Sequence, residues 1–277
     1  MNMKSLLLAL SLVVLAHALA ERLKNHEHDL CVVVRYYHGQ QNSLLALLSS
    51  LNSAHGDESM LVHIVVTDED AGDARKAARH VTLAIEALNQ CSTSSTFKME
   101  LAPYFYSSSV VKSYRSDNLK CQQQDYGYGL TDVALNDLVQ RDICTYMLFT
   151  NGDNLYNSNL LAATKEYRHD RYDLIGYYFS SRYTGSKVAT DQGLTEREQK
   201  NVLFRSRMAF QQIDLGACIF KTELFRRDQN LRFCEAASND PRGRGIIAEA
   251  DGYLIEKIAL REGIKQKVLD QVLFMHQ

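Results

Sequence analysis

Long runs of apolar and β-branched residues, separated by stretches with helical spacing, constrain most strongly what this chain can fold into. The first run, residues 30–37 (LCVVVRYY), shows little alternation of apolar and polar residues, which is typical of a strand buried on both faces. Residues 41–51 then place leucines at intervals that fit one face of a helix. Since strands buried on both faces occur in parallel sheets covered by helices, this order predicts an α/β fold with a mostly parallel central sheet.

The same alternation continues through the chain. Further strands are predicted at residues 61–67, 97–101, 145–149, 174–179, 217–220 and 268–274, and further helices at residues 73–88, 129–140, 222–227 and 248–261. Residues 182–212 are polar and predict a flap or short helices over a site. No linker or repeat interrupts the order, so residues 21–277 are predicted to form a single domain.

The first twenty residues are predicted to be a secretory signal peptide. Lys4 gives a positive start, residues 6–15 are apolar apart from Ser11, and Ala18-Leu19-Ala20 offers a small-residue cleavage site. The apolar stretch is shorter than the roughly 20 residues that a membrane-spanning helix needs. We therefore expect export to the secretory pathway (the lumen of the ER or Golgi) or secretion, with no stable membrane span.

The charge and cysteine content limit the classes of partner and compartment. A formal net charge of −2 gives no strong positive field, so a nucleic-acid partner is not expected. All six cysteines follow the signal peptide, which permits disulfides in an oxidising compartment. Buried apolar thiols are an equally good interpretation of several of them.

A polar segment follows the predicted strand at residues 145–149 without transition. It reads Thr150-Asn151-Gly152-Asp153-Asn154. Ligands of open α/β sheets bind beyond the carboxyl ends of strands, and a carboxylate there can hold a hard cation that bridges phosphates. The same segment is consistent with an Asx turn that caps a helix near Asn157.

Two later positions carry similar alternatives. Glu249 and Asp251 lie at the start of the predicted helix 248–261, where acidic residues also occur simply because they complement the helix dipole. His276 follows the last predicted strand, and a lone histidine near a terminus is commonly a surface residue.

Taken in chain order, Asp153, Asp251 and His276 resemble the pattern of GT-A-type nucleotide-sugar glycosyltransferases, close to the large inverting family 2 with its DxD motif. The resemblance runs from about residue 30 to residue 277. It implies a Rossmann-like three-layer α/β/α sandwich. It also implies a hexosyltransferase-type activity that moves a sugar from a UDP- or GDP-sugar donor to a hydroxyl of a glycan or glycoconjugate, with inversion.

The resemblance assigns metal and catalytic roles. Asn151-Gly152-Asp153 stands in the place of the DxD motif, with its first carboxylate replaced by an amide. Asp153 and His276 would bind Mn²⁺ or Mg²⁺ on the donor diphosphate. The Glu-Asp pair of the family reads Ala250-Asp251, so Asp251 is the candidate base, with Glu249 in reserve.

The resemblance also assigns nucleotide contacts. Tyr37 would stack on the base, and Asp68 and Asp70 would accept hydrogen bonds from it. Asn151 and Gly152 would contact the nucleotide. The Ala-Arg-Asn of the family reads Ala134-Leu135-Asn136, which keeps Asn136 as a nucleotide contact but lacks the arginine.

The sequence is consistent with several alternative functions. A secreted, catalytically weak nucleotide-sugar or glycan-binding protein on the same fold would explain the missing carboxylate and arginine. A metal-dependent phosphoesterase needs more clustered ligands, and a nucleotidyltransferase needs a glycine-rich loop that is absent after the first strand. Asp214 is either a donor-sugar contact or a loop carboxylate, and Arg242 and Arg244 either clamp phosphate or are solvated.

Overall fold

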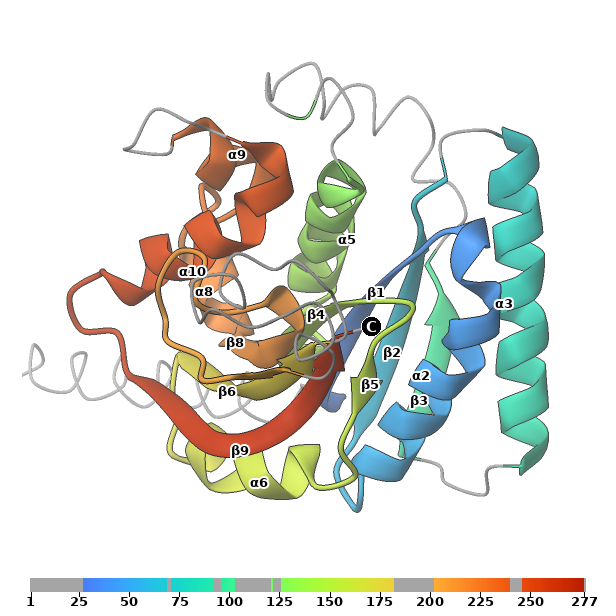
Figure 1. Ribbon diagram of the computed structural model, residues 1–277, viewed down its shortest axis with the longest axis horizontal. Helices are drawn as coiled ribbons and strands as arrows, with labels where there is room; N and C mark the ends of the chain where they lie inside the picture. Colours follow the sequence, from blue (N-terminus) through green and yellow to red (C-terminus); the bar gives the residue numbers. More distant parts are fainter. Residues whose placement is uncertain are drawn as a thin grey trace, which may run out of the picture.

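One nine-stranded sheet contains the strands of the described part of this protein. The structure is a computed structural model that describes residues 27–68, 71–91, 96–102, 121, 126–181, 202–239 and 246–276. The strand order is β3-β2-β1-β4-β8-β6-β9-β5, with β7 beside β6 (Figure 1). The strands are β1 (His28–Tyr36), β2 (Met60–Val66), β3 (Phe97–Leu101), β4 (Cys144–Asn151), β5 (Leu155–Tyr156), β6 (Leu174–Ser181), β7 (Val202–Phe204), β8 (Cys218–Lys221) and β9 (Gln266–His276).

The sheet is mostly parallel, as the sequence predicts. Strands β3, β2, β1 and β4 are parallel neighbours, and β6 and β9 pair in the same direction. Strands β5, β7 and β8 run the opposite way, so six of the nine strands share one direction. Register shifts next to Tyr178 interrupt the β6–β9 pairing, and bulges of this kind bend and twist a strand. Figure 1 shows β9 as a strongly curved strand.

The helices form two groups by their contacts. Among the described residues, the α-helices are α2 (Gln41–Ala54), α3 (Ala71–Cys91), α5 (Tyr128–Arg141), α6 (Leu160–His169), α8 (Thr222–Arg227), α9 (Phe233–Ser238) and α10 (Ala250–Ala259). Short 3-10 turns are η1 (His38–Gln40), η3 (Leu215–Ala217) and η4 (Ile247–Glu249). Helix α2 contacts α3 and α6, whereas α5 contacts α8 and α9, and α9 contacts α10. None of the helices in the described part of the chain is long and apolar enough to cross a membrane.

Some predicted features lie outside the described residues. They are the signal peptide at residues 1–20, Asp70, Arg242, Arg244 and residues 182–201 of the predicted flap. The remaining part of the flap includes β7, which pairs with β6.

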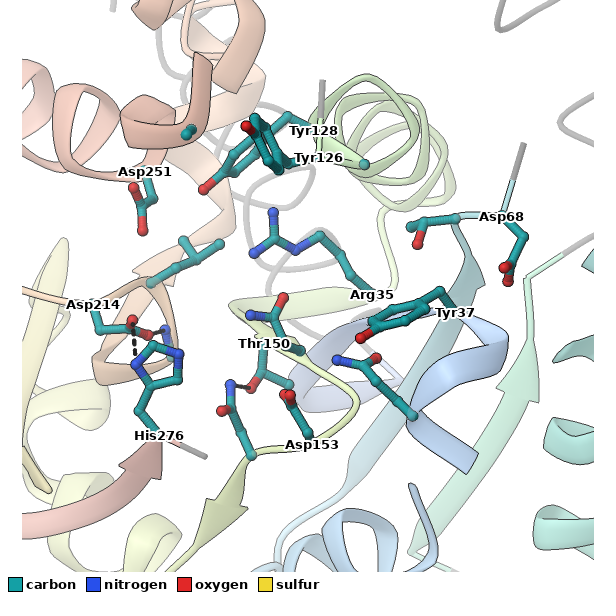
Figure 2. A pocket seen from close by; sticks show the side chains of 18 residues that line it. Arg35, Tyr37, Asp68, Tyr126, Tyr128, Thr150, Asp153, Asp214, Asp251 and His276 are labelled. Carbon is teal, nitrogen blue, oxygen red and sulfur yellow. Dashed lines mark hydrogen bonds and ion pairs between the residues drawn. The ribbon is translucent and has the colours of Figure 1, made fainter. Parts of the chain in front are cut away.

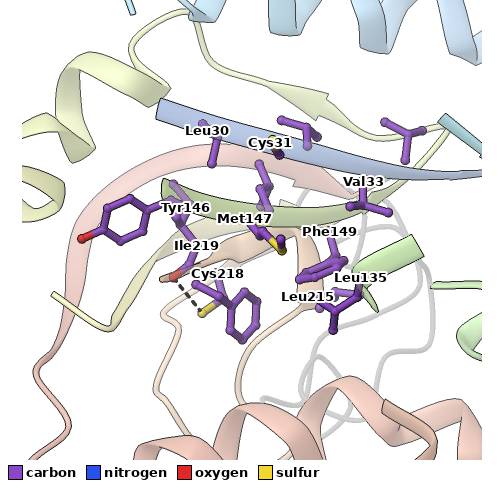
Figure 3. Packing of buried hydrophobic residues seen from close by; sticks show 14 of the residues in the cluster. Leu30, Cys31, Val33, Leu135, Tyr146, Met147, Phe149, Leu215, Cys218 and Ile219 are labelled. Carbon is purple, nitrogen blue, oxygen red and sulfur yellow. Dashed lines mark hydrogen bonds between the residues drawn. The ribbon is translucent and has the colours of Figure 1, made fainter. Parts of the chain in front are cut away.

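The centre of the core lies where β1, β4 and β8 meet (Figure 3). Leu30, Val33, Phe149 and Ile219 are fully buried there, and Leu135 of α5 packs into the same cluster. Apolar side chains removed from water contribute roughly 1.5–3 kcal/mol each, so this cluster is a main source of stability.

Two disulfides join segments that are distant in sequence. Cys31 of β1 is bonded to Cys144 of β4, and Cys121 is bonded to Cys234 of α9, with a sequence separation of 113 in each pair. Cys218 is a buried free thiol. The disulfide interpretation therefore holds for four cysteines and the buried-thiol interpretation for one.

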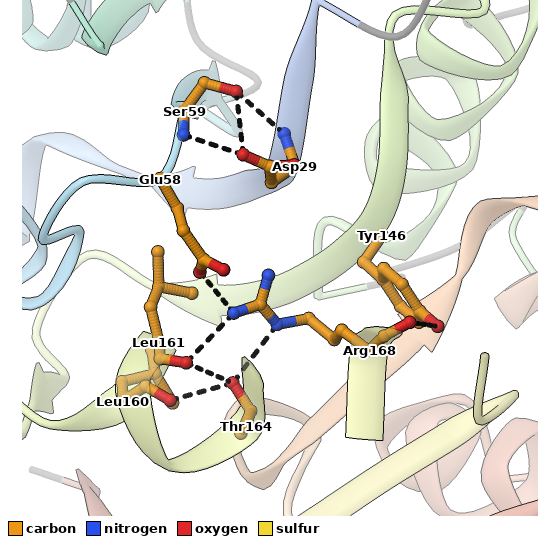
Figure 4. A network of polar contacts seen from close by, with 8 residues as sticks. All are labelled: Asp29, Glu58, Ser59, Tyr146, Leu160, Leu161, Thr164 and Arg168. Atoms are coloured by element: carbon orange, nitrogen blue, oxygen red, sulfur yellow. Dashed lines mark hydrogen bonds and ion pairs between the residues drawn. The ribbon is translucent and has the colours of Figure 1, made fainter. Parts of the chain in front are cut away.

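A buried ion pair fixes α6 against the loop before β2 (Figure 4). The Arg168 guanidinium, with a side chain only 3% exposed, bonds the Glu58 carboxylate and donates to the Leu161 carbonyl oxygen at 2.9 Å. Its Nε donates to Thr164 Oγ1 at 3.3 Å, and the Arg168 carbonyl oxygen accepts from the Tyr146 hydroxyl at 3.0 Å. The network thus links α6, β4 and the loop before β2.

A second network, around Glu100, predicts how the free energy of unfolding depends on pH. Glu100 Oε1 lies 2.8 Å from Nδ1 of the fully buried His63 and 2.8 Å from Arg141 Nη1. The hydrogen bond with His63, and then that with Arg141, holds the pKa of Glu100 down at about 2. Because the folded pKa lies below the unfolded value of about 4.3, the contribution of Glu100 is full above that value and is lost as the pH falls toward 2.

Replacing Glu100 by glutamine should therefore make the free energy of unfolding decrease less steeply as the pH falls from 5 to 2. Urea unfolding midpoints at several pH values in this range measure the effect. Glu86→Gln, at an exposed position of α3, is the matched control and should keep the wild-type slope. An equal slope for Glu100→Gln and the wild type would contradict the assignment.

Candidate functional site

A cavity of about 930 Å³ opens beyond the carboxyl ends of β1, β2 and β4 (Figure 2). The loop before η3, the start of α5, the start of α10 and the end of β9 complete its walls. Six of the residues that the sequence predicts for the site line this cavity: Tyr37, Asp68, Asn151, Asp153, Asp251 and His276. The fold thus brings together side chains that lie more than 200 residues apart in the sequence.

Strand register and one glycine place the segment after β4. Arg35 of β1 is the register partner of Asn151 of β4, and the Gly152 N–H donates to the Arg35 carbonyl oxygen at 2.9 Å. A Cβ atom at position 152 would lie 2.8 Å from Gln40 Oε1 and 2.9 Å from Tyr36 Cδ2. A side chain at this position would have to displace the Tyr36 ring and the Gln40 amide, so glycine suits this close approach. Gly152 therefore shapes the turn, and its backbone is the part that meets the neighbouring strand.

Asp153 presents an oxygen that has no partner within the described part of the protein. Its Oδ1 is buried and accepts no hydrogen bond. The predicted Asx turn is made instead by Asn157, whose Oδ1 accepts from the Asn159 N–H at 2.9 Å just before α6. An unsatisfied buried carboxylate oxygen costs free energy, so its presence at a cavity wall indicates a ligand position.

Asp251 is a carboxylate with an altered acidity. Burial raises its pKa to about 6, and the negative charge of Asp214 adds to the rise. The Gly252 N–H, which donates to Asp251 Oδ1 at 2.8 Å, and the Arg35 charge act in the opposite direction. A carboxylate that titrates near neutral pH is suited to take a proton as a general base.

His276 and Asp214 lie next to each other in the cavity wall. The distance from His276 Nδ1 to Asp214 Oδ2 is 3.4 Å. Asp214 also accepts from the Gly216 N–H at 2.8 Å, which caps η3. Asp214 thus has a structural role as a loop carboxylate and also lines the cavity.

Tyr37 and Asp68 form the wall at the ends of β1 and β2. The side chain of Tyr37 is 46% exposed, so its ring is accessible for stacking. Asp68 Oδ2 accepts from the His38 N–H at 2.9 Å, and its Oδ1 bonds His38 Nδ1. That hydrogen bond raises the pKa of His38. Asp68 is therefore already engaged by His38 while it borders the cavity.

Asn136 and Glu249 do not line this cavity. Asn136 Oδ1 accepts from Arg232 Nε at 2.6 Å and borders a separate cavity of about 680 Å³. Glu249 accepts from Gln211 Nε2 at 2.6 Å and from the Tyr253 hydroxyl at 3.1 Å. Both predicted residues have protein partners elsewhere.

Arg35, Tyr126 and Tyr128 are among the cavity residues that the sequence interpretation missed. Arg35 lies with its guanidinium carbon 4.4 Å from the centre of the Tyr128 ring. Tyr126, with a left-handed φ of 53°, is 59% exposed at the cavity wall. A sequence signal existed for Arg35, because it is the charged residue of the otherwise uncharged run at residues 30–37.

The donor set of the cavity fits a cation that is shared with a bound diphosphate. No three His, Cys, Asp or Glu side chains in the described ranges are placed to hold a metal ion on their own. Mg²⁺ is commonly held by one or two carboxylates together with substrate phosphates, and an unpartnered Asp153 oxygen suits that role. The His276 imidazole is a ligand of the type that transition metals accept.

Comparison with known proteins shows the fold. No protein-family model and no curated protein matches the sequence. The Staphylococcus aureus TarS 1–349 structure in complex with UDP superposes with a TM-score of 0.52 at 13% identity, over 89% of this chain and 60% of that one. This chain thus spans about 60% of the length of the TarS structure that it matches.

Two further structures show a weaker likeness. The mannosyltransferase PcManGT from Pyrobaculum calidifontis, in complex with GDP-Man and Mn²⁺, has a TM-score of 0.49 at 12% identity, over 90% of this chain and 57% of that one. Mouse xyloside xylosyltransferase 1 has a TM-score of 0.48 at 15% identity, over 87% of this chain and 85% of that one. At such identities, the superposition on TarS shows a shared mixed α/β fold and leaves activity to be argued from the site.

Proposed function

We propose that this protein is a GT-A-type glycosyltransferase that moves a sugar from a UDP- or GDP-sugar to a hydroxyl of a glycan or glycoconjugate, with inversion. One observation carries the proposal: Asp153, Asp251 and His276 line a single cavity at the carboxyl ends of the strands. The fold shared with TarS, whose structure contains UDP, supports it. A hexosyl donor is the subtype that we propose.

The strand order supports the three-layer α/β/α arrangement that we propose for this domain. The connection from β1 through α2 leads to β2 on one side of β1, and the connection from β3 through α5 leads to β4 on the other side. Such crossovers are almost always right-handed. A helix in a connection that leads to one side of β1 therefore covers one face of the sheet, and a helix in a connection that leads to the other side covers the opposite face.

The donor would lie across the strand ends. We propose that Tyr37 stacks on the base, that Asp68 and Asp70 border it, and that Asn151 and the Gly152 backbone contact the nucleotide. Asp153 and His276 would hold Mn²⁺ or Mg²⁺. When bound, that cation would neutralise charge on the departing diphosphate.

Asp251 would act on the acceptor. The acceptor hydroxyl attacks the anomeric carbon of the donor while Asp251 takes its proton, and the bond from that carbon to the diphosphate breaks. Direct displacement of this kind inverts the anomeric centre. Glu249 is a reserve base at the same helix start, although Gln211 and Tyr253 already bond its carboxylate.

A second function is favoured by a specific residue. Asn151 provides no charge where the resemblance expects a carboxylate, so the protein could bind nucleotide sugars or glycans with little catalysis. Binding without turnover would select this alternative.

We also propose residence in the secretory pathway or secretion. Disulfides persist in oxidising compartments, and two are present here. Residues 1–20 would provide the signal peptide, and residues 21–277 would form the single domain.

A thermal-shift screen of UDP- and GDP-linked hexoses, with and without Mn²⁺, tests the proposed function. A donor at 100 times its Kd should stabilise the folded state by about 2.7 kcal/mol. Asp153→Asn should lose the part of that shift that requires Mn²⁺, because it removes the charged ligand oxygen. Asp57→Asn, at an exposed loop position, is the matched control. If no nucleotide sugar stabilises the wild type, the proposal is wrong.

A further inference from the structure

We infer that Arg35 is a phosphate-binding residue of the cavity and offsets part of the charge of the donor diphosphate by direct contact, whether or not a divalent cation is bound. This inference rests on the proposed function, because it takes the donor to be a nucleoside diphosphate sugar. It concerns a residue that carries no role in the resemblance described above.

The first observation is the state of the Arg35 side chain. Arg35 is only 9% exposed, lines the cavity, and has an Nε that donates to no acceptor in the described part of the chain. Figure 2 shows its guanidinium reaching into the cavity, between Thr150 and Tyr128. A buried guanidinium donor left without an acceptor is costly, so the position is suited to an anionic ligand.

The second observation is the charge around it. Among the described residues that line the cavity, four are carboxylates: Asp68, Asp153, Asp214 and Asp251. His276 already faces Asp214. Arg35 is the permanently charged cation of that lining set. A diphosphate would add negative charge to this wall, and Arg35 is the side chain of the set that can offset it without a metal.

The third observation is the register of β1 and β4. Arg35 and Asn151 are paired positions on neighbouring parallel strands, so their side chains leave the same face of the sheet next to each other. A carboxylate at position 151 would form an ion pair with the guanidinium and occupy it. The uncharged Asn151 amide leaves the guanidinium available for phosphate.

The structure also offers a merely structural role for Arg35. Its guanidinium lies over the Tyr128 ring, and its charge lowers the pKa of Asp251. Neither contact distinguishes a nucleoside diphosphate from a nucleoside. The preference for the diphosphate over the nucleoside therefore separates phosphate binding from support of the cavity wall.

The test measures binding of UDP, uridine, GDP and guanosine by calorimetry in EDTA. The wild type should bind the diphosphate that it accepts more tightly than the matching nucleoside. Arg35→Met should weaken diphosphate binding about 10- to 100-fold, the range of a charged hydrogen bond, and leave nucleoside binding within about twofold. Arg35→Lys should lose less, because it keeps the charge but not the planar fork. Arg75→Met, at an exposed position of α3, should match the wild type.

A charge insertion gives a second test that does not remove Arg35. Asn151→Asp should weaken diphosphate binding in EDTA and increase the relative gain from Mn²⁺, because the new carboxylate both pairs with the guanidinium and binds the metal. If Arg35→Met and Arg35→Lys keep the wild-type ratio of diphosphate to nucleoside affinity, or if Asn151→Asp leaves diphosphate binding in EDTA unchanged, the inference is wrong.

A wild type that binds a diphosphate in this way but transfers no sugar would support the inference and contradict the proposed transferase function. A wild type that binds no nucleotide would overturn both.

Discussion

Replacing Asp251 by asparagine is expected to lower sugar transfer by about 10²–10⁴-fold, the contribution of a positioned general base. The amide has nearly the same shape as the carboxylate but cannot take the acceptor proton. Donor binding should persist, because Asp251 would act on the acceptor and not on the nucleotide. Steady-state transfer rates and calorimetric donor binding, measured on the same preparation, separate the two effects.

The acid limb of the rate profile gives this prediction a second readout. Since the pKa of Asp251 is about 6 and only the deprotonated form is a base, kcat/KM for transfer should fall as the pH drops through that value. Asp214→Asn removes the neighbouring negative charge, so it should move the acid limb to lower pH. Glu249→Gln is the matched control and should keep most activity. A larger loss for Glu249→Gln than for Asp251→Asn would reverse the assignment of the base.

Replacing Arg168 by methionine is expected to lower the free energy of unfolding by about 3–5 kcal/mol. Methionine keeps much of the side-chain volume but leaves the Glu58 carboxylate, 11% exposed, without its cation. An uncompensated buried charge is more costly than the loss of the pair itself. Urea unfolding at neutral pH measures the change.

Two companion variants make that result interpretable. Lys165→Met, on the exposed face of the same helix, should change stability by less than about 0.5 kcal/mol. Combining Arg168→Met with Glu58→Gln should restore part of the loss, because the stranded charge is gone. No recovery in the double variant would show that packing of the Arg168 stem, and not charge, causes the loss.

An element can be predicted from the sequence when the residues within it carry the pattern, and not when it depends on pairing with a distant segment. Strands β1, β2 and β4 are long apolar runs, so burial on both faces is visible in the sequence. Strand β5 has two residues and exists through its pairing with β9, more than 100 residues away. Helix α6 buries the polar residues Thr164 and Arg168 beyond its first turn, and α9 has only six residues, so neither contains a long series of apolar residues in the sequence.

The site divides in the same way. Strand-end residues such as Asp153 could be placed from the sequence, because the carboxyl ends of parallel strands meet at one edge. The direction of a helix side chain changes by about 100° per residue, so a motif match could not show that Asn136 faces Arg232. Arg35 required the pairing of β1 with β4, which is a long-range property.

The two disulfides interlock along the chain, because Cys121 lies between Cys31 and Cys144, whereas Cys144 lies between Cys121 and Cys234. As the polypeptide emerges from a ribosome, Cys31 therefore meets Cys91 and Cys121 before its own partner has been synthesised. Bonds formed in order of emergence would be non-native. Native pairing therefore requires either that each thiol stays reduced until its own partner has been made, or that early bonds are reshuffled by thiol–disulfide exchange.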